Sequence, residues 1–245
     1  MTDWIYGLIS KKKAISKHIT KVEFDIGLFI VSIWLVEKNG HFFMIDTGIG
    51  KLGSGEMIDY SLRKYFPKIN IEALFLTHGH SDHVGGVSNL LKRNPSLPIF
   101  INHREFPYLL GEKPYPRRKN LEQVNFDASL LRSLSSEEAK VSLAKAGLTP
   151  LWTPGHSPGH TCYYHEGDQV LIAGDLLTTN RRGTLRPPMK AFTADMPEAL
   201  ATAHHLLQTY PQALLSVCHG GEIQNALAEM KKSAWYGKRE SKNGK

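Results

Sequence analysis

Three histidines and an aspartate stand within six residues of the chain, in the run His78-Gly79-His80-Ser81-Asp82-His83. The run directly follows residues 71–76, an apolar stretch with the length and composition of a buried strand. Imidazole and carboxylate are ligands that zinc prefers, and four of them so close in sequence cannot all reach one ion without strain. The run therefore predicts a loop at the end of a strand that binds two adjacent metal ions.

Three further motifs each place polar side chains beside a short apolar stretch. The first is TPGHSPGH at residues 153–160, whose prolines and glycines fix the loop and lower the entropy that a ligand loses on binding metal. We favour His156 over His160 as the ligand in this motif. The others are Asp175 and His219, each at the end of an expected strand. Alone, either residue is typical of a cap or a satisfied polar group, so the prediction rests on the combination.

Apolar stretches of strand length alternate with segments of helical spacing along the chain. We expect strands at residues 30–37, 42–45, 71–76, 99–101, 151–153, 162–165, 170–173 and 214–217. We expect helices at residues 57–66, 84–91, 121–134, 137–146 and 225–236, and one that begins near Asp195. The pair Asn39-Gly40 favours a tight turn between the first two strands. This alternation predicts an α/β fold.

The length of 245 residues fits one domain, residues 1–245. Proline-rich sequence followed by two expected helices marks residues 104–149 as a helical insertion or lid between the second and third metal motifs. Residues 237–245 are polar, and we expect them to fray.

The motifs follow one another in an order that resembles the metallo-β-lactamase superfamily. The resemblance runs from about Trp34 to Gly221 and includes Asp46-Thr47-Gly48 and the Gly85-Gly86 pair after the histidine run. It implies an αββα sandwich with two zinc ions as cofactors. The implied ligands are His78, His80 and His156 for one zinc, Asp82, His83 and His219 for the other, and Asp175 between the two. The resemblance also implies that Asp46 supports the ligands, and we expect the same of His160.

Two zinc ions imply hydrolysis, because a water bridging them loses its proton near neutral pH and becomes a nucleophilic hydroxide. Asp82 is the expected catalytic residue that accepts a proton from the intermediate. In having a carboxylate between the two implied metal ions, at position 175, the chain is similar to glyoxalase II and the acyl-homoserine lactonases. The lactonases carry a catalytic tyrosine three residues later, where this chain has Thr178. Glyoxalase II binds glutathione through basic residues of a C-terminal helical extension, and the basic segment at residues 231–239 shares that composition without a matching motif.

We therefore expect a lactone, a thioester or another carboxylic ester as the substrate. Contacts to it are expected from residues 104–149 and 176–192, with Arg186 binding an anion and Tyr108 and Phe192 forming apolar contacts. The alternative function is a metal-dependent phosphodiesterase or nuclease, which a net charge of +7 would suit. The basic residues are scattered, with no aromatic-interleaved stripe, so we expect a small-molecule substrate and no nucleic-acid partner.

The sequence also predicts a cytoplasmic protein. No apolar run reaches the roughly 20 residues that a membrane helix needs. The apolar residues 4–9 precede the basic residues 11–13, which inverts the order of a secretory signal. Cys162 and Cys218 are too few for a disulfide framework, so we expect free thiols.

Overall fold

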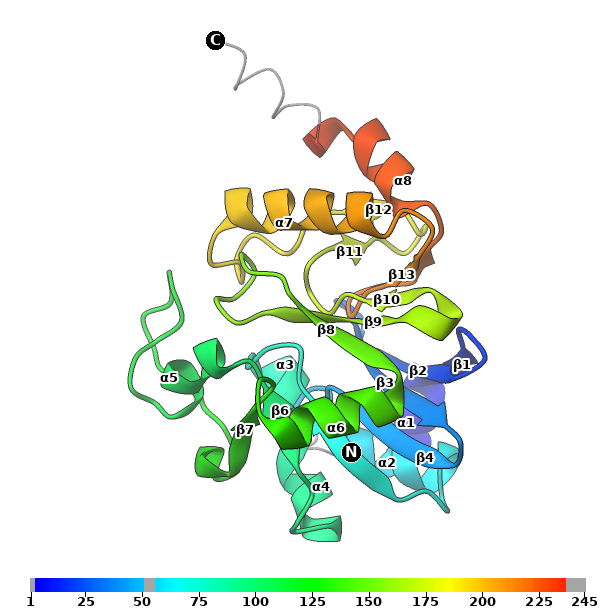
Figure 1. The fold of residues 1–245 in the computed structure, drawn as a ribbon, viewed down its shortest axis with the longest axis vertical. Coiled ribbons are helices and arrows are strands. Elements are labelled where there is room, and N and C mark those ends of the chain that lie inside the picture. The colour runs from blue at the N-terminus through cyan, green and yellow to red at the C-terminus, as the bar shows by residue number, and fades with distance from the viewer. Residues whose placement is uncertain (1–2, 51–55, 237–245) are drawn as a thin grey trace.

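Two β-sheets lie face to face in the computed structural model, which describes residues 3–50 and 56–236 (Figure 1). The larger sheet has the order β1 to β7, with strands Ser10–Ala14, Ile19–Asp25, Ile30–Lys38, His41–Ile45, Ile71–Phe75, Ile99–Ile101 and Leu131–Ser133. The smaller sheet has the order β14-β13-β10-β9-β8, with β8 Leu148–Trp152, β9 Thr161–His165, β10 Val170–Ile172, β13 Leu214–Ser216 and β14 Glu222–Ile223. A short pair, β11 (Thr178–Thr179) and β12 (Leu185–Arg186), stands apart.

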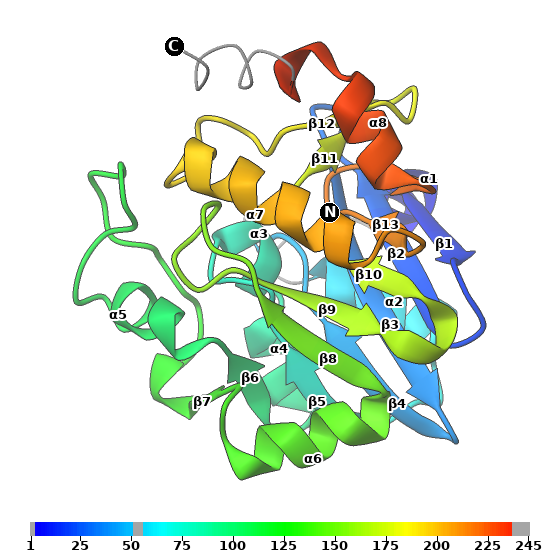
Figure 2. The same ribbon diagram turned by 45° about the horizontal axis from the view of Figure 1, so that its top comes forward.

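Helices cover the outer face of each sheet, so the layers follow the order helix, sheet, sheet, helix (Figure 2). The helices α1 (Asp3–Ile9), α2 (Glu56–Tyr65) and α4 (Val87–Arg93) pack on the larger sheet. On the smaller sheet lie α7 (Met196–Thr209) and α8 (Ala226–Lys232), while α6 (Glu137–Ala146) contacts β3, β4 and β8. The shortest helices are α3 (Ser81–Val84) and α5 (Phe106–Leu109). This is the expected αββα sandwich.

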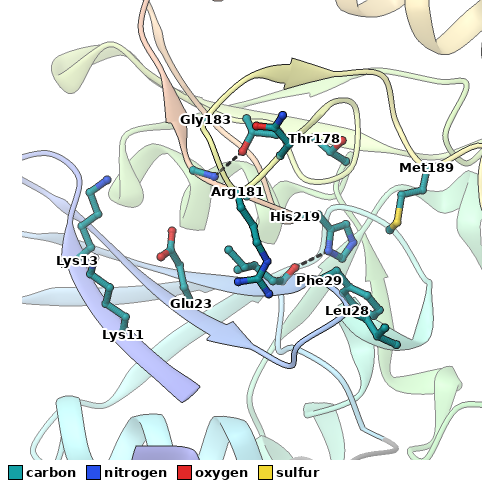
Figure 3. A pocket seen from close by; sticks show the side chains of 15 residues that line it. Lys11, Lys13, Glu23, Leu28, Phe29, Thr178, Arg181, Gly183, Met189 and His219 are labelled. Atoms are coloured by element: carbon teal, nitrogen blue, oxygen red, sulfur yellow. Dashed lines mark hydrogen bonds between the residues drawn. The ribbon is translucent and has the colours of Figure 1, made fainter. Parts of the chain in front are cut away.

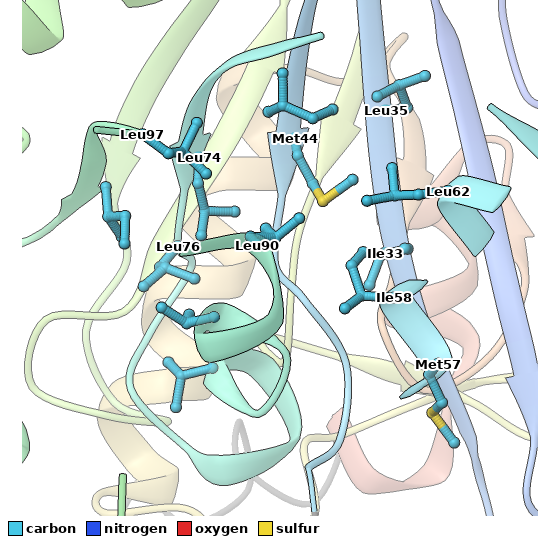
Figure 4. Close-up of a cluster of buried hydrophobic side chains, with 14 of the residues drawn as sticks. Ile33, Leu35, Met44, Met57, Ile58, Leu62, Leu74, Leu76, Leu90 and Leu97 are labelled. Carbon is cyan, nitrogen blue, oxygen red and sulfur yellow. The ribbon is translucent and has the colours of Figure 1, made fainter. Parts of the chain in front are cut away.

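The central strands are apolar on both faces because each face contacts a different layer. In β5, Leu74 packs against the helices α2 and α4, and its neighbour Phe75 packs between the two sheets. Figure 4 shows the first of these cores, in which Ile33 and Met44 of the larger sheet meet Ile58 of α2. Burial on both faces gives the strands near-continuous apolar sequences, which made them easy to recognise.

Most expected elements form close to their expected positions, and two differ. The expected helix at 121–134 is wrong: a 3₁₀ turn at Ala128–Leu130 leads into β7, which pairs in parallel with β6. Its apolar residues Val124 and Phe126 pack against the first core, so tertiary pairing overrides local spacing. The single helix expected at 84–91 is divided into α3 and α4. The strands β1 and β2, at one end of the larger sheet, were not predicted.

Several local predictions are confirmed. Asn39 and Gly40 adopt positive φ in the turn between β3 and β4, and Asp195 caps α7 by accepting from the N–H of Glu198. Cys162 and Cys218 are buried free thiols. Among the described residues, no helix is long and apolar enough to cross a bilayer. The tail expected to fray, residues 237–245, lies outside the described residues.

Candidate metal centre

The polar motifs meet at one edge of the sandwich, where the strands that precede them end. The histidine run follows β5, His156 lies between β8 and β9, Asp175 follows β10, and His219 follows β13. Because β10 and β13 are parallel, their carboxyl ends bring Asp175 and His219 to the same place. All these side chains except that of Asp82 are almost fully buried.

Three histidines form the first group of the site. The Nδ1 of His80 lies 2.9 Å from the Nε2 of His78 and 3.0 Å from the Nε2 of His156. Burial lowers the pKa of all three rings, that of His156 to about 4, so they are neutral at pH 7. One ring nitrogen from each residue converges on a common point, as ligands of a divalent cation do.

The second group contains His83, Asp175 and His219, with the thiol of Cys218 beside them. The Oδ1 of Asp175 lies 3.2 Å from the Nε2 of His83, and its Oδ2 lies 3.1 Å from the Nε2 of His219. Burial by itself would lower the pKa of both histidines, but Asp175 and Cys218 raise it well above its usual value. Asp82 adds an oxygen 3.2 Å from the Nε2 of His219.

Asp175 joins the two groups, because its Oδ2 also lies 3.5 Å from the Nε2 of His156. The Nε2 atoms of His83 and His219 and the Oδ1 of Asp175 are buried without a hydrogen bond. Unsatisfied polar atoms of this kind are costly unless an ion or water satisfies them. The residues therefore fit metal ions, and seven nitrogen- or oxygen-bearing side chains exceed what one tetrahedral ion accepts.

Asp46 lies behind the second group and bonds to one of its histidines. Its Oδ2 accepts hydrogen bonds from the Nδ1 of His83 at 2.7 Å and from the hydroxyl of Thr77 at 2.8 Å. Its Oδ1 accepts from the backbone N–H of Thr77 at 2.8 Å. The bond to Nδ1 leaves the Nε2 of His83 free to face Asp175 and a metal ion.

His160 supports Asp175 through the backbone. The Nε2 of His160 accepts the N–H of Asp175 at 3.1 Å, and its Nδ1 lies 2.8 Å from the hydroxyl of Thr153. Both ring nitrogens of His160 are thus engaged within the protein, whereas the Nε2 of His156 faces His80 and Asp175.

A pH-dependent loss of stability should follow from the burial of His160, which lowers its pKa to about 3. An unfolded chain has a histidine pKa near 6.5, so between these values it takes up a proton that the folded chain does not. The free energy of unfolding of chelator-treated protein should therefore fall by about 1 kcal/mol on this account between pH 7 and pH 5.5. Urea titrations at the two pH values measure it. The His160→Gln variant should lose less on acidification, and equal losses would contradict the assignment.

Two buried charged residues beside the centre were not predicted from the sequence. Glu105, at the end of a 3₁₀ turn after β6, accepts four hydrogen bonds from groups around the histidine loops. Lys21 of β2 is fully buried and donates to the carbonyl of Gly220 at 2.5 Å, next to His219. Neither residue belongs to a sequence motif. The sequence signal that could have pointed to Glu105 is the glycine at position 159, where Glu105 packs against the backbone.

A cavity of about 510 Å³ opens on the His219 side of the centre. Figure 3 shows Lys11, Lys13 and Glu23 on one side of it and His219 towards the opposite end. Of its basic side chains, Lys13 pairs with Glu222, and Arg181 pairs with Asp25 at 2.7 Å. Much of the positive charge around this cavity is therefore compensated.

A second cavity of about 200 Å³ lies over the other side of the centre, where His80, Asp82 and Asp175 form part of its wall. The rest of its lining is mostly apolar and consists of Phe29, Ile49, Ser81, Arg118, Met189 and Phe192. Arg118 is the cation among these residues. Phe29 and Met189 also line the larger cavity. The two cavities thus adjoin above the candidate ligands.

The residues expected to contact the substrate are separated by the structure. Phe192 is half exposed and lines the smaller cavity. Tyr108 is buried and stacks on Tyr115 at 4.3 Å, and Arg186 is exposed on β12; neither lines the two cavities. Arg118 takes the place beside the centre that we expected for Arg186.

Thr178 lines the larger cavity, but its hydroxyl donates to the carbonyl of Pro187 at 3.0 Å. It therefore joins β11 to the residue that follows β12.

A sequence model of the metallo-beta-lactamase superfamily matches residues 26–219. The chain belongs to this superfamily. Probable metallo-hydrolase YybB of Bacillus subtilis is 34% identical over 214 residues, which cover 86% of this chain and 91% of that protein. A hydroxyacylglutathione hydrolase of Pectobacterium carotovorum is 34% identical over 146 residues, 59% of this chain and 46% of that enzyme, so the chain spans about half of its length.

Solved structures show the same fold. The metallo-beta-lactamase family protein TTHA1429 from Thermus thermophilus superposes with a TM-score of 0.65 at 19% identity, over 93% of this chain and 81% of that one. TTHA1623 in a di-iron-bound form gives a TM-score of 0.58 at 23% identity, over 86% of this chain and 97% of that one. This chain is a metallo-hydrolase of the superfamily, and the residues described above are its candidate metal ligands.

Proposed function

We propose that this metallo-hydrolase binds two divalent metal ions, with zinc as the first choice, and cleaves a lactone, thioester or other carboxylic ester of a small molecule. The observation that carries the proposal is the pair of buried ligand groups joined by Asp175 at the floor of the adjoining cavities. His78, His80 and His156 would hold one ion. Asp82, His83 and His219 would hold the other, and Asp175 would contact both.

When bound, such ions lower the pKa of water and polarise a carbonyl group, which is the chemistry that ester hydrolysis needs. The protein itself supplies the orientation of the ligands, through Asp46 behind His83 and His160 behind Asp175. Asp82 is partly exposed to the smaller cavity, where its carboxylate can accept a proton and pass it to a leaving group.

The cleft favours a small substrate with two unlike parts. Phe29, Met189 and Phe192 provide apolar contacts around one end. At the other end, the larger cavity is lined by polar and charged side chains, of which Lys13 and Arg181 are paired in salt bridges. A long basic groove, as a nucleic-acid backbone requires, does not line these cavities. Hydroxyacylglutathione hydrolase, which matches part of this chain, is named for a thioester of this general kind, so a thioester belongs in the first set of substrates tested.

Turnover of a panel of lactones, thioesters, carboxylic esters and phosphodiesters by zinc-loaded and iron-loaded protein tests the proposal. Iron belongs in the test because the similar fold of TTHA1623 has been seen in a di-iron-bound form. We expect chelator-sensitive hydrolysis of at least one carboxylic substrate, and a loss of about 10²-fold or more in the Asp82→Asn variant, the lower end of what general acid–base groups contribute.

RNA and DNA are the counter-test. Binding through several phosphates would weaken by about 10³-fold or more between roughly 50 and 200 mM salt. Metal-dependent cleavage of nucleic acid with that salt dependence, and no turnover of any carboxylic substrate, would replace the proposal with a phosphodiesterase.

A further inference from the structure

Glu105 is a fully buried carboxylate that touches both loops of the three-histidine group. Its Oε2 accepts the backbone N–H of Gly79 at 3.0 Å, between His78 and His80. Its Oε1 accepts the N–H of Gly159 at 2.5 Å and the hydroxyl of Ser157 at 2.8 Å, next to His156. One side chain therefore ties together two loops that lie far apart in the sequence.

Tyr115 completes the arrangement. Its hydroxyl donates to the Oε2 of Glu105 at 2.5 Å, and its ring meets the ring of His80 edge-on at 4.8 Å between centroids. Burial raises the pKa of Glu105, and hydrogen bonds from four donors oppose that rise by stabilising the ionised form. These hydrogen bonds fix the positions of both loop backbones, and the ring of Tyr115 fixes that of His80.

The glycines of the two loops fit this contact closely. A Cβ added to Gly159 would lie 2.7 Å from the Cγ of Glu105, and one added to Gly79 would lie 2.3 Å from the hydroxyl oxygen of Tyr115. Both distances are shorter than real Cβ contacts, so any larger residue would push Glu105 or Tyr115 away. Glu105 thus accounts for the glycine at position 159, and its partner Tyr115 accounts for the glycine at position 79.

The second ligand group has a different support. Asp46 bonds to His83, while His160 holds the backbone of Asp175 and Lys21 holds the carbonyl after His219. The hydrogen bonds of Glu105 go to the loops of His78, His80 and His156. Asp46 bonds directly to a ligand of the second group and reaches the first group only through Thr77, whose hydroxyl lies 3.1 Å from the Nδ1 of His78. Glu105 is therefore the buried carboxylate that bonds directly to the loops of the first group.

We propose that Glu105 is a positioning residue that sets the metal affinity of the three-histidine position and leaves the other position unaffected. The inference rests on the proposed dinuclear centre. Residues that orient metal ligands typically contribute about 10- to 100-fold to affinity. Glu105→Gln keeps the shape of the side chain but turns an amide NH₂ towards one pair of donors, so its effect should reach this range.

The test measures zinc affinity by competition with a chelator in two backgrounds, each of which keeps one position. His219→Ala keeps the three-histidine position, and His156→Ala keeps the other. Glu105→Gln should weaken zinc binding about 10- to 100-fold in the first background and less than about threefold in the second. Asp46→Asn, the matched control, should show its larger loss in the second background, because Asp46 bonds directly to His83 and reaches His78 only through Thr77.

Equal losses in both backgrounds, or no loss in the first, would overturn the role of Glu105. Thermal unfolding of the metal-free variants separates this role from a general loss of the fold, and Tyr115→Phe gives a second probe that removes one hydrogen bond and no charge. It should weaken zinc binding in the His219→Ala background alone. Because zinc affinity is read without substrate, failure of the proposed activity would appear separately, as absent turnover with these affinities unchanged.

Discussion

Replacing Asp175 with asparagine should nearly abolish turnover and lower the metal content, whereas replacing Thr178 with alanine should change little. Asp175 places one oxygen 3.2 Å from His83 and the other 3.1 Å from His219 and 3.5 Å from His156. An amide at this position loses the negative charge that both ions would share. We expect a loss beyond the roughly 10²-fold that residues outside the ligand set contribute.

Thr178 provides the matched control because it lies three residues away and also lines the cleft. Its hydroxyl bond to Pro187 is a neutral bond worth about 1 kcal/mol, so Thr178→Ala should retain activity within about tenfold. Turnover and elemental analysis of both variants measure the difference. If Thr178→Ala lost activity as severely as Asp175→Asn with both ions still bound, the threonine would have a catalytic role that its geometry does not indicate.

Alanine at Gly155 should destabilise the fold severely, although it adds only one methyl group. Gly155 precedes His156 at a φ of +124°, and a Cβ there would lie 2.1 Å from the backbone nitrogen of Ala199 in α7. Backbone strain and the clash together predict a loss of about 4 kcal/mol, or roughly 10 °C in the melting temperature. The backbone N–H groups of Ala194 and Asp195, directly before α7, also donate to the carbonyls of His156 and Gly155, so the candidate ligand His156 would move with the helix.

Gly111→Ala separates the clash from the strain. Gly111 also has a positive φ, +74°, but nothing lies within 4 Å of the Cβ position, so we expect a loss of about 1 kcal/mol. Calorimetry of the two variants, with and without zinc, gives the comparison. Similar melting temperatures for both would show that α7 yields at little cost and that its packing does not hold the His156 loop.

Local sequence was sufficient for most strands of both sheets and for the ligand motifs. Burial on both faces makes strands such as β5 continuously apolar, and a turn such as Asn39-Gly40 has a conformation that few residue pairs adopt. The same holds for the metal motif, because four ligand-type side chains in six residues are a chemical signal independent of the rest of the chain. Residues 121–134 misled us because spacing reports local periodicity, and here the edge of β6 offered a partner for a strand.

The sequence by itself predicted the candidate metal ligands, because ligand-type side chains lie at short spacing in residues 78–83 and the later motifs follow in an order that resembles a known superfamily. Tertiary structure decided what holds and surrounds them. Glu105 contacts Gly79 and Gly159 across 26 and 54 residues, and Lys21 reaches Gly220 across 199. The path of the chain likewise placed Arg118, not Arg186, beside the centre. Such contacts leave no periodic trace in the sequence, because they depend on how distant loops and strands meet after the sheets have packed.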